Sequence, residues 1–143
     1  MTTLLDLDAD ARVLEVGTGS GYHAAVVAQL VDGLVTIEII RPLAERAASR
    51  LDRQRYGNVT VIHGDGYYGY AEAAPFDGIV VTAAAGHVPP PLIDQLVRGG
   101  RMVIPVERSG WAQNLLLVRK NADGEIRTER LMPVRFVPLT GAH

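Results

Sequence analysis

The stretch of the sequence best suited to chemistry is the glycine-rich run 15–21, which reads EVGTGSG. It follows the apolar run 12–16 and precedes a segment of helical period, as a strand-to-helix turn does. Glycine suits such a turn because the backbone bends tightly and a ligand can approach without meeting a Cβ atom. Glu38 lies 21 positions after Gly17, at the end of the next strand-like run, where a carboxylate normally binds a ribose diol. A glycine-rich turn alone is common, but this combination predicts a nucleotide-type binding site.

Glycine spacing and local charge favour one class of nucleotide over another. Dinucleotide sites typically read G-x-G-x-x-G, whereas Gly17, Gly19 and Gly21 give G-x-G-x-G. Glu15 stands just ahead of the turn, and a carboxylate there would repel a pyrophosphate but attract an α-ammonium or a sulfonium group. The sign of this charge therefore predicts S-adenosylmethionine rather than NAD. The plainer alternative is that Glu15 only ends a strand in solvent.

A second turn, 64–66, reads Gly-Asp-Gly and follows the third strand-like run, 59–63. It should lie at the same edge of the sheet as the first turn. Asp65 could accept a hydrogen bond from an adenine amino group while the neighbouring amide donates to the ring. An Asp-Gly pair also favours an ordinary Asx turn, so the adenine contact is an interpretation that depends on the other two features.

The sequence contains no constellation for acid–base, nucleophilic or metal chemistry. There is no cysteine, and the four histidines, at positions 23, 63, 87 and 143, have no metal-ligand spacing. Methyl transfer to a carboxylate needs no general base, because a carboxyl group with a pKa of about 4 is already ionised at neutral pH. The protein has only to align the two groups and keep water out. We therefore predict no metal and assign no catalytic residue.

Length and composition bound the remaining possibilities. The 143 residues, of which 48% are hydrophobic and 21% charged, predict a single domain over 1–143. A net charge of −2 offers no basic field for nucleic acid, and no apolar run approaches the roughly 20 residues of a membrane-spanning helix. The first residues include several acidic ones and lack the basic and apolar regions of a signal peptide. We expect a cytoplasmic monomer.

Apolar runs of strand length alternate with segments of helical period, which indicates a parallel sheet with crossover helices. The last two runs are joined by a short turn containing Asp123-Gly124, which predicts an antiparallel hairpin. The expected fold is α/β: a Rossmann-like class I methyltransferase fold with a mostly parallel sheet and a C-terminal antiparallel hairpin. The predicted strands are 12–16, 34–40, 59–63, 78–82, 101–106, 114–120 and 125–137, the predicted helices are 21–31, 42–55 and 89–96, and 67–74 is a loop or short helix.

Four long segments in the same order resemble the protein-L-isoaspartate O-methyltransferase family. They are 13–22 (VLEVGTGSGY), 64–85 (GDGYYGYAEAAPFDGIVVTAAA), 89–106 (PPPLIDQLVRGGRMVIPV) and 131–141 (LMPVRFVPLTG). The resemblance implies transfer of a methyl group from S-adenosylmethionine to the α-carboxyl group of L-isoaspartyl residues in damaged proteins. The methyl ester then closes to a succinimide, which can reopen as aspartate. Isoaspartyl-containing peptides and proteins would be the partners.

The family pattern also implies roles for individual residues. Gly17 and Gly19 would line the cofactor, Glu38 and Ile39 would hold the ribose, and Thr140 would close the site near cofactor and substrate. Asp65 and Gly66 would contact the adenine. With the residues of the first turn, the predicted cofactor-binding set is Glu15, Gly17, Thr18, Gly19, Glu38, Ile39, Asp65, Gly66 and Thr140.

The sequence departs from the family pattern at its start. Family members carry a sizeable region before the first strand, with an I-G-x-G-Q-T-I-S-x-P-like segment whose serine helps hold the substrate. Here Met1 falls about where the helix before the first strand should be under way. Two alternatives therefore stay open: an inactive or partly active S-adenosylmethionine-binding fragment, and a methyltransferase for another small molecule. The ending 133–141 (PVRFVPLTG) argues against the second alternative.

Overall fold

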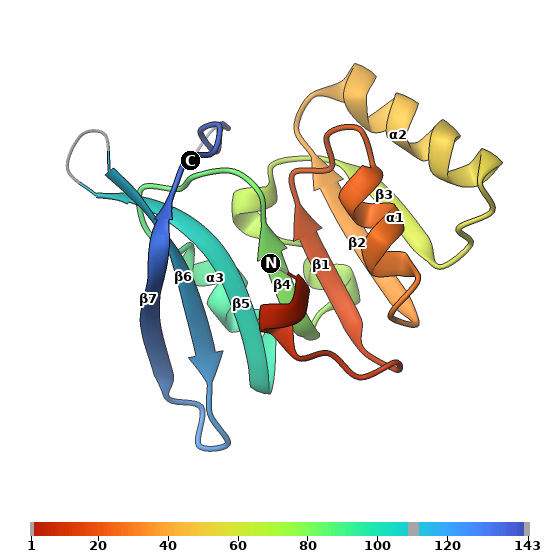
Figure 1. The fold of residues 1–143 in the computed structure, drawn as a ribbon. Coiled ribbons are helices and arrows are strands. Elements are labelled where there is room, and N and C mark those ends of the chain that lie inside the picture. The colour runs from red at the N-terminus through yellow and green to blue at the C-terminus, as the bar shows by residue number, and fades with distance from the viewer. Residues whose placement is uncertain (1, 109–111, 142–143) are drawn as a thin grey trace.

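A seven-stranded mixed sheet forms the centre of the described molecule (Figure 1). The structure is a computed structural model that describes residues 2–108 and 112–141. The strand order is β3-β2-β1-β4-β5-β6-β7. The first five strands in this order pair in parallel, and β5, β6 and β7 pair antiparallel. This confirms the predicted fold class. The strands are β1 (Arg12–Val16), β2 (Gly33–Glu38), β3 (Val59–His63), β4 (Phe76–Val81), β5 (Leu96–Arg108), β6 (Ala112–Lys120) and β7 (Ile126–Val134).

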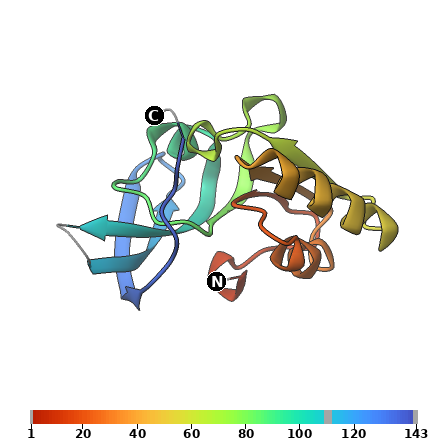
Figure 2. The same ribbon diagram turned by 90° about the horizontal axis from the view of Figure 1, so that it is seen from above.

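Helices cover both faces of the parallel part of the sheet. Figure 2 shows α1 and α3 on opposite sides of it. Leu51 of α2 shares a buried cluster with Ala24 and Val27 of α1, whereas Leu92 of α3 belongs to the cluster on the other face. The helices are α1 (Tyr22–Ala28), α2 (Arg41–Arg53) and α3 (Pro90–Asp94), and the short 3₁₀ turns are η1 (Thr2–Leu5), η2 (Gly66–Tyr68) and η3 (Ala71–Ala73). Among the described residues, no helix is long and apolar enough to span a bilayer.

The central strands are buried on both faces. In β1 every residue after Arg12 is buried, and in β4 every residue except Asp77 is buried. A strand covered on both sides reads as a continuous apolar run rather than an alternating one, which is the pattern of a parallel sheet between two helical layers. These two strands therefore give a rigid base to the loops at their carboxyl ends.

Several boundaries differ from the predicted ones because of long-range contacts. β5 begins at Leu96 rather than at 101, because Leu96 pairs with Phe76 and the chain continues in the sheet through 98–100 after a register shift. α1 ends at Ala28, three residues earlier than predicted. β7 ends at Val134 rather than at 137, because the chain then leaves the sheet and forms a bridge between Pro138 and Ala84. The predicted loop or short helix at 67–74 contains η2 and η3.

Candidate cofactor site

A cleft of about 290 Å³ lies at the carboxyl ends of the first four strands. After β1 the chain crosses over to β2, which pairs with one edge of β1, whereas β4 pairs with the opposite edge of β1. Such a switch point is where open α/β sheets bind their ligands, and the volume is near the lower end of ordinary ligand pockets. The lining comprises glycine-loop backbone, strand ends and the C-terminal segment: Val16, Gly17, Gly19, Ile37, Glu38, Ile39, Ile40, Leu43, Gly66, Thr82, Ala83, Val137, Pro138, Leu139 and Thr140.

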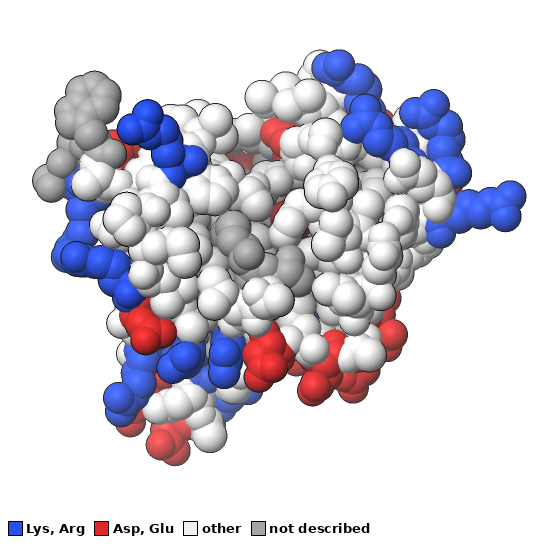
Figure 3. Space-filling model, viewed as in Figure 1, with Lys and Arg blue, Asp and Glu red and all other residues white. Residues whose placement is uncertain are grey.

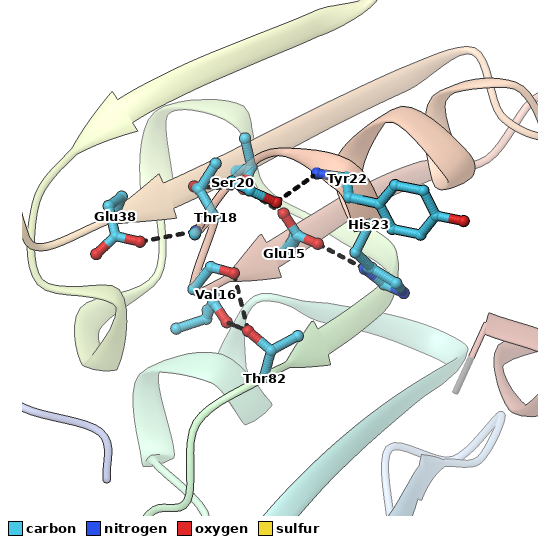
Figure 4. A network of polar contacts seen from close by, with 11 residues as sticks. Glu15, Val16, Thr18, Ser20, Tyr22, His23, Glu38 and Thr82 are labelled. Carbon is cyan, nitrogen blue, oxygen red and sulfur yellow. Dashed lines mark hydrogen bonds and ion pairs between the residues drawn. The ribbon is translucent and has the colours of Figure 1, made fainter. Parts of the chain in front are cut away.

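The glycine loop is fixed from both neighbouring strands. The Gly17 amide donates to the carbonyl of Ile37 at 2.8 Å. The Thr82 hydroxyl donates to the carbonyls of Val16 and Gly17 at 3.0 and 2.8 Å (Figure 4). Gly17 has φ +100°, and a Cβ atom there would collide with the Thr82 hydroxyl. Gly19 has φ +54° and open space where its Cβ atom would be, so its backbone faces the cleft unobstructed. Both positions form a cradle that side chains would strain or fill.

Glu38 holds its carboxylate at the cleft, at the end of β2. Its Oε1 atom accepts a hydrogen bond from the Gly19 amide at 2.8 Å (Figure 4). Its Oε2 atom accepts one from the Ile40 amide at 3.2 Å. The residue is only 7% exposed. A carboxylate fixed by two amides still has free lone pairs, which can accept from the hydroxyl groups of a diol. This geometry suits the role that spacing alone predicted for Glu38.

The side chains of Glu15 and Thr18 are buried and are not among the lining of the cleft. Glu15 is fully buried; Oε1 accepts from the Thr36 hydroxyl at 2.5 Å, and Oε2 lies 2.5 Å from Nδ1 of His23. The hydroxyls of Thr18 and Thr36 are 2.6 Å apart. Strand alternation turns the Glu15 side chain toward α1, and its contact with a positively charged ligand stays a prediction. The geometry is that of a group that supports the loop.

His23 is a residue that sequence reasoning left without a role. It is in the first turn of α1, and its ring reaches back to the buried carboxylate of Glu15 (Figure 4). The only signal for this contact was a histidine just after a glycine turn that is preceded by an acidic strand residue. Thr82 was missed as well, because its contact with the loop joins residues 65 positions apart.

The Gly-Asp-Gly turn contributes backbone rather than the aspartate side chain to the cleft. Asp65 accepts from the Tyr67 amide at 3.0 Å and so caps η2, which is the Asx-type geometry. Its carboxylate also packs against Gly141, where no Cβ atom would fit. Gly66 lines the cleft, and a Cβ atom there would collide with Val16. The adenine contact of Asp65 stays a prediction.

Thr140 reaches the cleft because the chain after β7 is pinned to the loop after β4. The Ala84 amide donates to the carbonyl of Val137 at 2.7 Å, and the Leu139 amide donates to the carbonyl of Ala84 at 2.8 Å. Two consecutive hydrogen bonds on one residue fix the direction of the segment. Its residues Val137 to Thr140 then form one wall of the cleft.

Other aromatic and titratable groups lie outside the lining. Tyr67 bonds to Nε2 of His87 at 2.9 Å, which joins η2 to the loop after β4. Tyr70 donates to Glu72 at 2.9 Å, and this hydrogen bond raises the pKa of the Tyr70 phenol above its ordinary value near 10. Within the described ranges, no three His, Asp or Glu side chains gather as metal ligands do. Trp111 and His143 lie outside the described residues.

The doubly wound sheet, the terminal hairpin and the glycine loop at the switch point define a Rossmann-like class I methyltransferase fold. Residues 1–143 match the family model described as protein-L-isoaspartate(D-aspartate) O-methyltransferase (PCMT). The chain belongs to this family.

Similar proteins agree in sequence and in structure. Protein-L-isoaspartate O-methyltransferase 2 of Syntrophobacter fumaroxidans is 59% identical, and the match covers all of this chain and 58% of the relative's length. Protein-L-isoaspartate O-methyltransferase 1 of Nitrosospira multiformis is 57% identical, and the match covers all of this chain and 61% of the relative's length. The chain thus spans about three fifths of these relatives. A solved protein-L-isoaspartate O-methyltransferase superposes with a TM-score of 0.93 at 34% identity, over 98% of this chain and 45% of that one. A protein of Plasmodium falciparum assigned to the same activity, in complex with S-adenosyl-L-homocysteine, gives 0.83 at 27% identity, over 93% and 67%.

Proposed function

We propose that this chain forms the S-adenosylmethionine-binding part of an enzyme that methylates the α-carboxyl group of L-isoaspartyl residues in damaged proteins. The observation that carries the proposal is the joint placement of the glycine loop and the Glu38 carboxylate in one cleft. Family membership supports the reaction and the substrate class. The relative from Plasmodium falciparum, which holds S-adenosyl-L-homocysteine, supports the cofactor.

The residues of the cleft fit the three parts of S-adenosylmethionine. Glu38 and Ile39, at the end of β2, would hold the ribose, and the cradle of Gly17 and Gly19 would admit the methionine part against bare backbone. Gly66 would lie against the adenine, and Thr140 would cover the site from the C-terminal segment. When bound, the cofactor supplies a methyl group activated by its positive sulfur. We assign Glu15 and Thr18 to the support of the loop and keep Asp65 as a proposed neighbour of the adenine.

The described residues around the cleft have a task that needs no proton transfer. The acceptor is a carboxylate oxygen, which is ionised at neutral pH and forms its new bond to carbon without a base. The chain must hold the acceptor in line with the methyl group and exclude water. Apolar groups such as Ile37, Ala83 and Leu139 line the cleft and suit the second requirement.

A second candidate function is cofactor binding without methyl transfer. The observation in its favour is that the chain spans only 58% and 61% of the two relatives, so the acceptor site of the whole protein can include residues outside this sequence. Action on another small molecule is the less favoured reading, because the match to the family extends over residues 1–143. A cytoplasmic location, a monomeric state and the absence of nucleic-acid or membrane partners stay predictions.

Calorimetry combined with a transfer assay separates these candidates. The chain is titrated with S-adenosylmethionine, and methyl transfer is then measured to an isoaspartyl peptide and to its aspartyl twin. We expect binding, and transfer to the isoaspartyl peptide alone. Binding without transfer would refute the activity for this chain and favour the second candidate. No binding would refute the assignment of the cleft.

A further inference from the structure

The C-terminal hairpin sorts its charged residues onto two faces. On the η1 side, Leu115 and Leu117 pack in a buried cluster with Leu5, and Glu129 pairs with Arg119 at 3.8 Å. Strand alternation places Glu107, which is paired with Gln113, on this side too. The other side faces α3, as shown by Lys120, whose Nζ atom donates to the carbonyls of Ile93 and Leu96. The carboxylates of β5 and β7 are therefore on the η1 side.

The α3 side of the hairpin contains a hollow of about 240 Å³, here called the hairpin pocket. Two guanidinium groups, an amide and a hydroxyl surround a small apolar floor, and no carboxylate is among the lining residues. These are Val106, Arg108, Asn114, Leu116, Thr128 and Arg130. Neither Arg108 nor Arg130 forms an ion pair or side-chain hydrogen bond with any residue that the structure describes. Two like charges that share a pocket repel each other, and an anion between them would remove this repulsion.

Figure 3 shows the face of the molecule that carries η1 and α1, which is opposite to the hairpin pocket. On the face shown in Figure 3, most visible Asp and Glu side chains lie along the lower edge, below the amino ends of the parallel strands. Lys and Arg side chains gather over α2, whereas the hairpin carries side chains of both signs. The hairpin carboxylates Glu107 and Glu129 belong to this face and so point away from the pocket.

A short stretch of chain connects the hairpin pocket to the cofactor cleft. Ala83 lines the cleft, and Ala85, two residues on, pairs with β5 on either side of Val106, which lines the hairpin pocket. The Ala85 amide donates to Pro105 at 3.0 Å, and the Glu107 amide donates to Ala85 at 2.8 Å. Ala83 and Ala85 are at most about 7 Å apart, and paired strands lie about 4.8 Å apart, so Ala83 and Val106 are separated by at most about 12 Å. An extended peptide of roughly four residues covers that distance.

We propose that the hairpin pocket binds an acidic side chain of the polypeptide substrate, about four residues from the residue that is methylated. The position of the substrate in this inference rests on the proposed function, whereas the chemistry of the pocket rests on its lining residues alone. A carboxylate suits paired guanidinium groups because it can accept two parallel hydrogen bonds from one of them. Asn114 and Thr128 supply further donors on the same side. Both arginines are exposed, so salt should weaken the contact.

A pair of labelled peptides tests the pocket without requiring catalysis. Each has a central isoaspartyl residue, and the residues four positions to either side are Glu in one peptide and Gln in its twin. Fluorescence anisotropy should show about fourfold tighter binding of the Glu peptide, since two exposed charge contacts of about twofold each combine. The double variant Arg108→Gln/Arg130→Gln should bind both peptides equally.

The matched control is Arg119→Gln/Arg127→Gln, which removes the same charge from the opposite face of the hairpin, where these residues are paired across β6 and β7. It should keep most of the preference for the Glu peptide. Equal binding of the two peptides to the wild-type chain, or an unchanged preference in the Arg108→Gln/Arg130→Gln variant, would overturn the proposal. Tighter binding of a single-stranded DNA of equal charge would overturn its assignment to a polypeptide. A preference that is present while neither peptide is methylated would refute methyl transfer by this chain and leave the pocket standing.

Discussion

The substitution Thr36→Val tests the polar network beneath the glycine loop. Thr36 is fully buried in β2, and its hydroxyl donates to the Glu15 carboxylate and bonds to the Thr18 hydroxyl at 2.5 and 2.6 Å. Valine has nearly the same shape but no hydroxyl, so the substitution removes these contacts and leaves little empty space. Glu15 then loses one of its two side-chain partners in a site without exposure to solvent.

The expected loss of stability follows from these two contacts. A hydrogen bond to a charged group contributes about 1.5–3 kcal/mol, and one between neutral groups contributes about 1 kcal/mol. Thr36→Val should therefore lower the free energy of unfolding by about 3 kcal/mol. For a chain of this size that corresponds to a fall in Tm of about 10 °C. Folded domains have only about 5–15 kcal/mol of stability, so the effect is large.

Thermal unfolding followed by circular dichroism measures the effect, with Thr60→Val as the control. Thr60 is an exposed residue of the neighbouring strand β3, so the same chemical change there should alter the free energy of unfolding by less than about 0.5 kcal/mol. If Thr36→Val and Thr60→Val unfold at the same temperature, the network does not stabilise the fold and our reasoning about Glu15 is wrong.

Two further predictions concern the cleft. Glu38→Ala should weaken S-adenosylmethionine binding at least tenfold in calorimetry without unfolding the domain, because hydrogen bonds to a charged group are lost. The control Glu45→Ala, at an exposed position of α2, should not weaken binding. An unchanged affinity of the Glu38→Ala variant would exclude the ribose role. Gly17→Ala should lower the free energy of unfolding by about 2–4 kcal/mol and abolish binding, because its φ of +100° and the Thr82 hydroxyl oppose a Cβ atom. Gly86→Ala, which has open space and no positive φ, should melt like the wild type; equal melting of the two variants would contradict the cradle geometry.

Local signals in the sequence were enough to predict the architecture. Apolar runs and helical periods predicted the seven strands and three main helices, and the Asp123-Gly124 turn predicted the hairpin, because turn chemistry and periodicity act over a few residues. The placement of Glu38 at the cleft followed as well, since the carboxyl ends of neighbouring parallel strands meet at one edge of a sheet. The ligand contacts themselves remain predictions.

Only the tertiary structure decided where certain side chains point and which distant segments meet. Glu15 alternates with Leu14 and Val16, which face the α3 side, so its carboxylate turns to α1 and meets His23 rather than the cleft. Periodicity gives this alternation, but it does not tell which helix covers which face. The wall made by Val137 to Thr140 depends on Ala84, more than fifty positions earlier. Contacts over such distances are set by how whole layers pack, and no local pattern in the sequence records them.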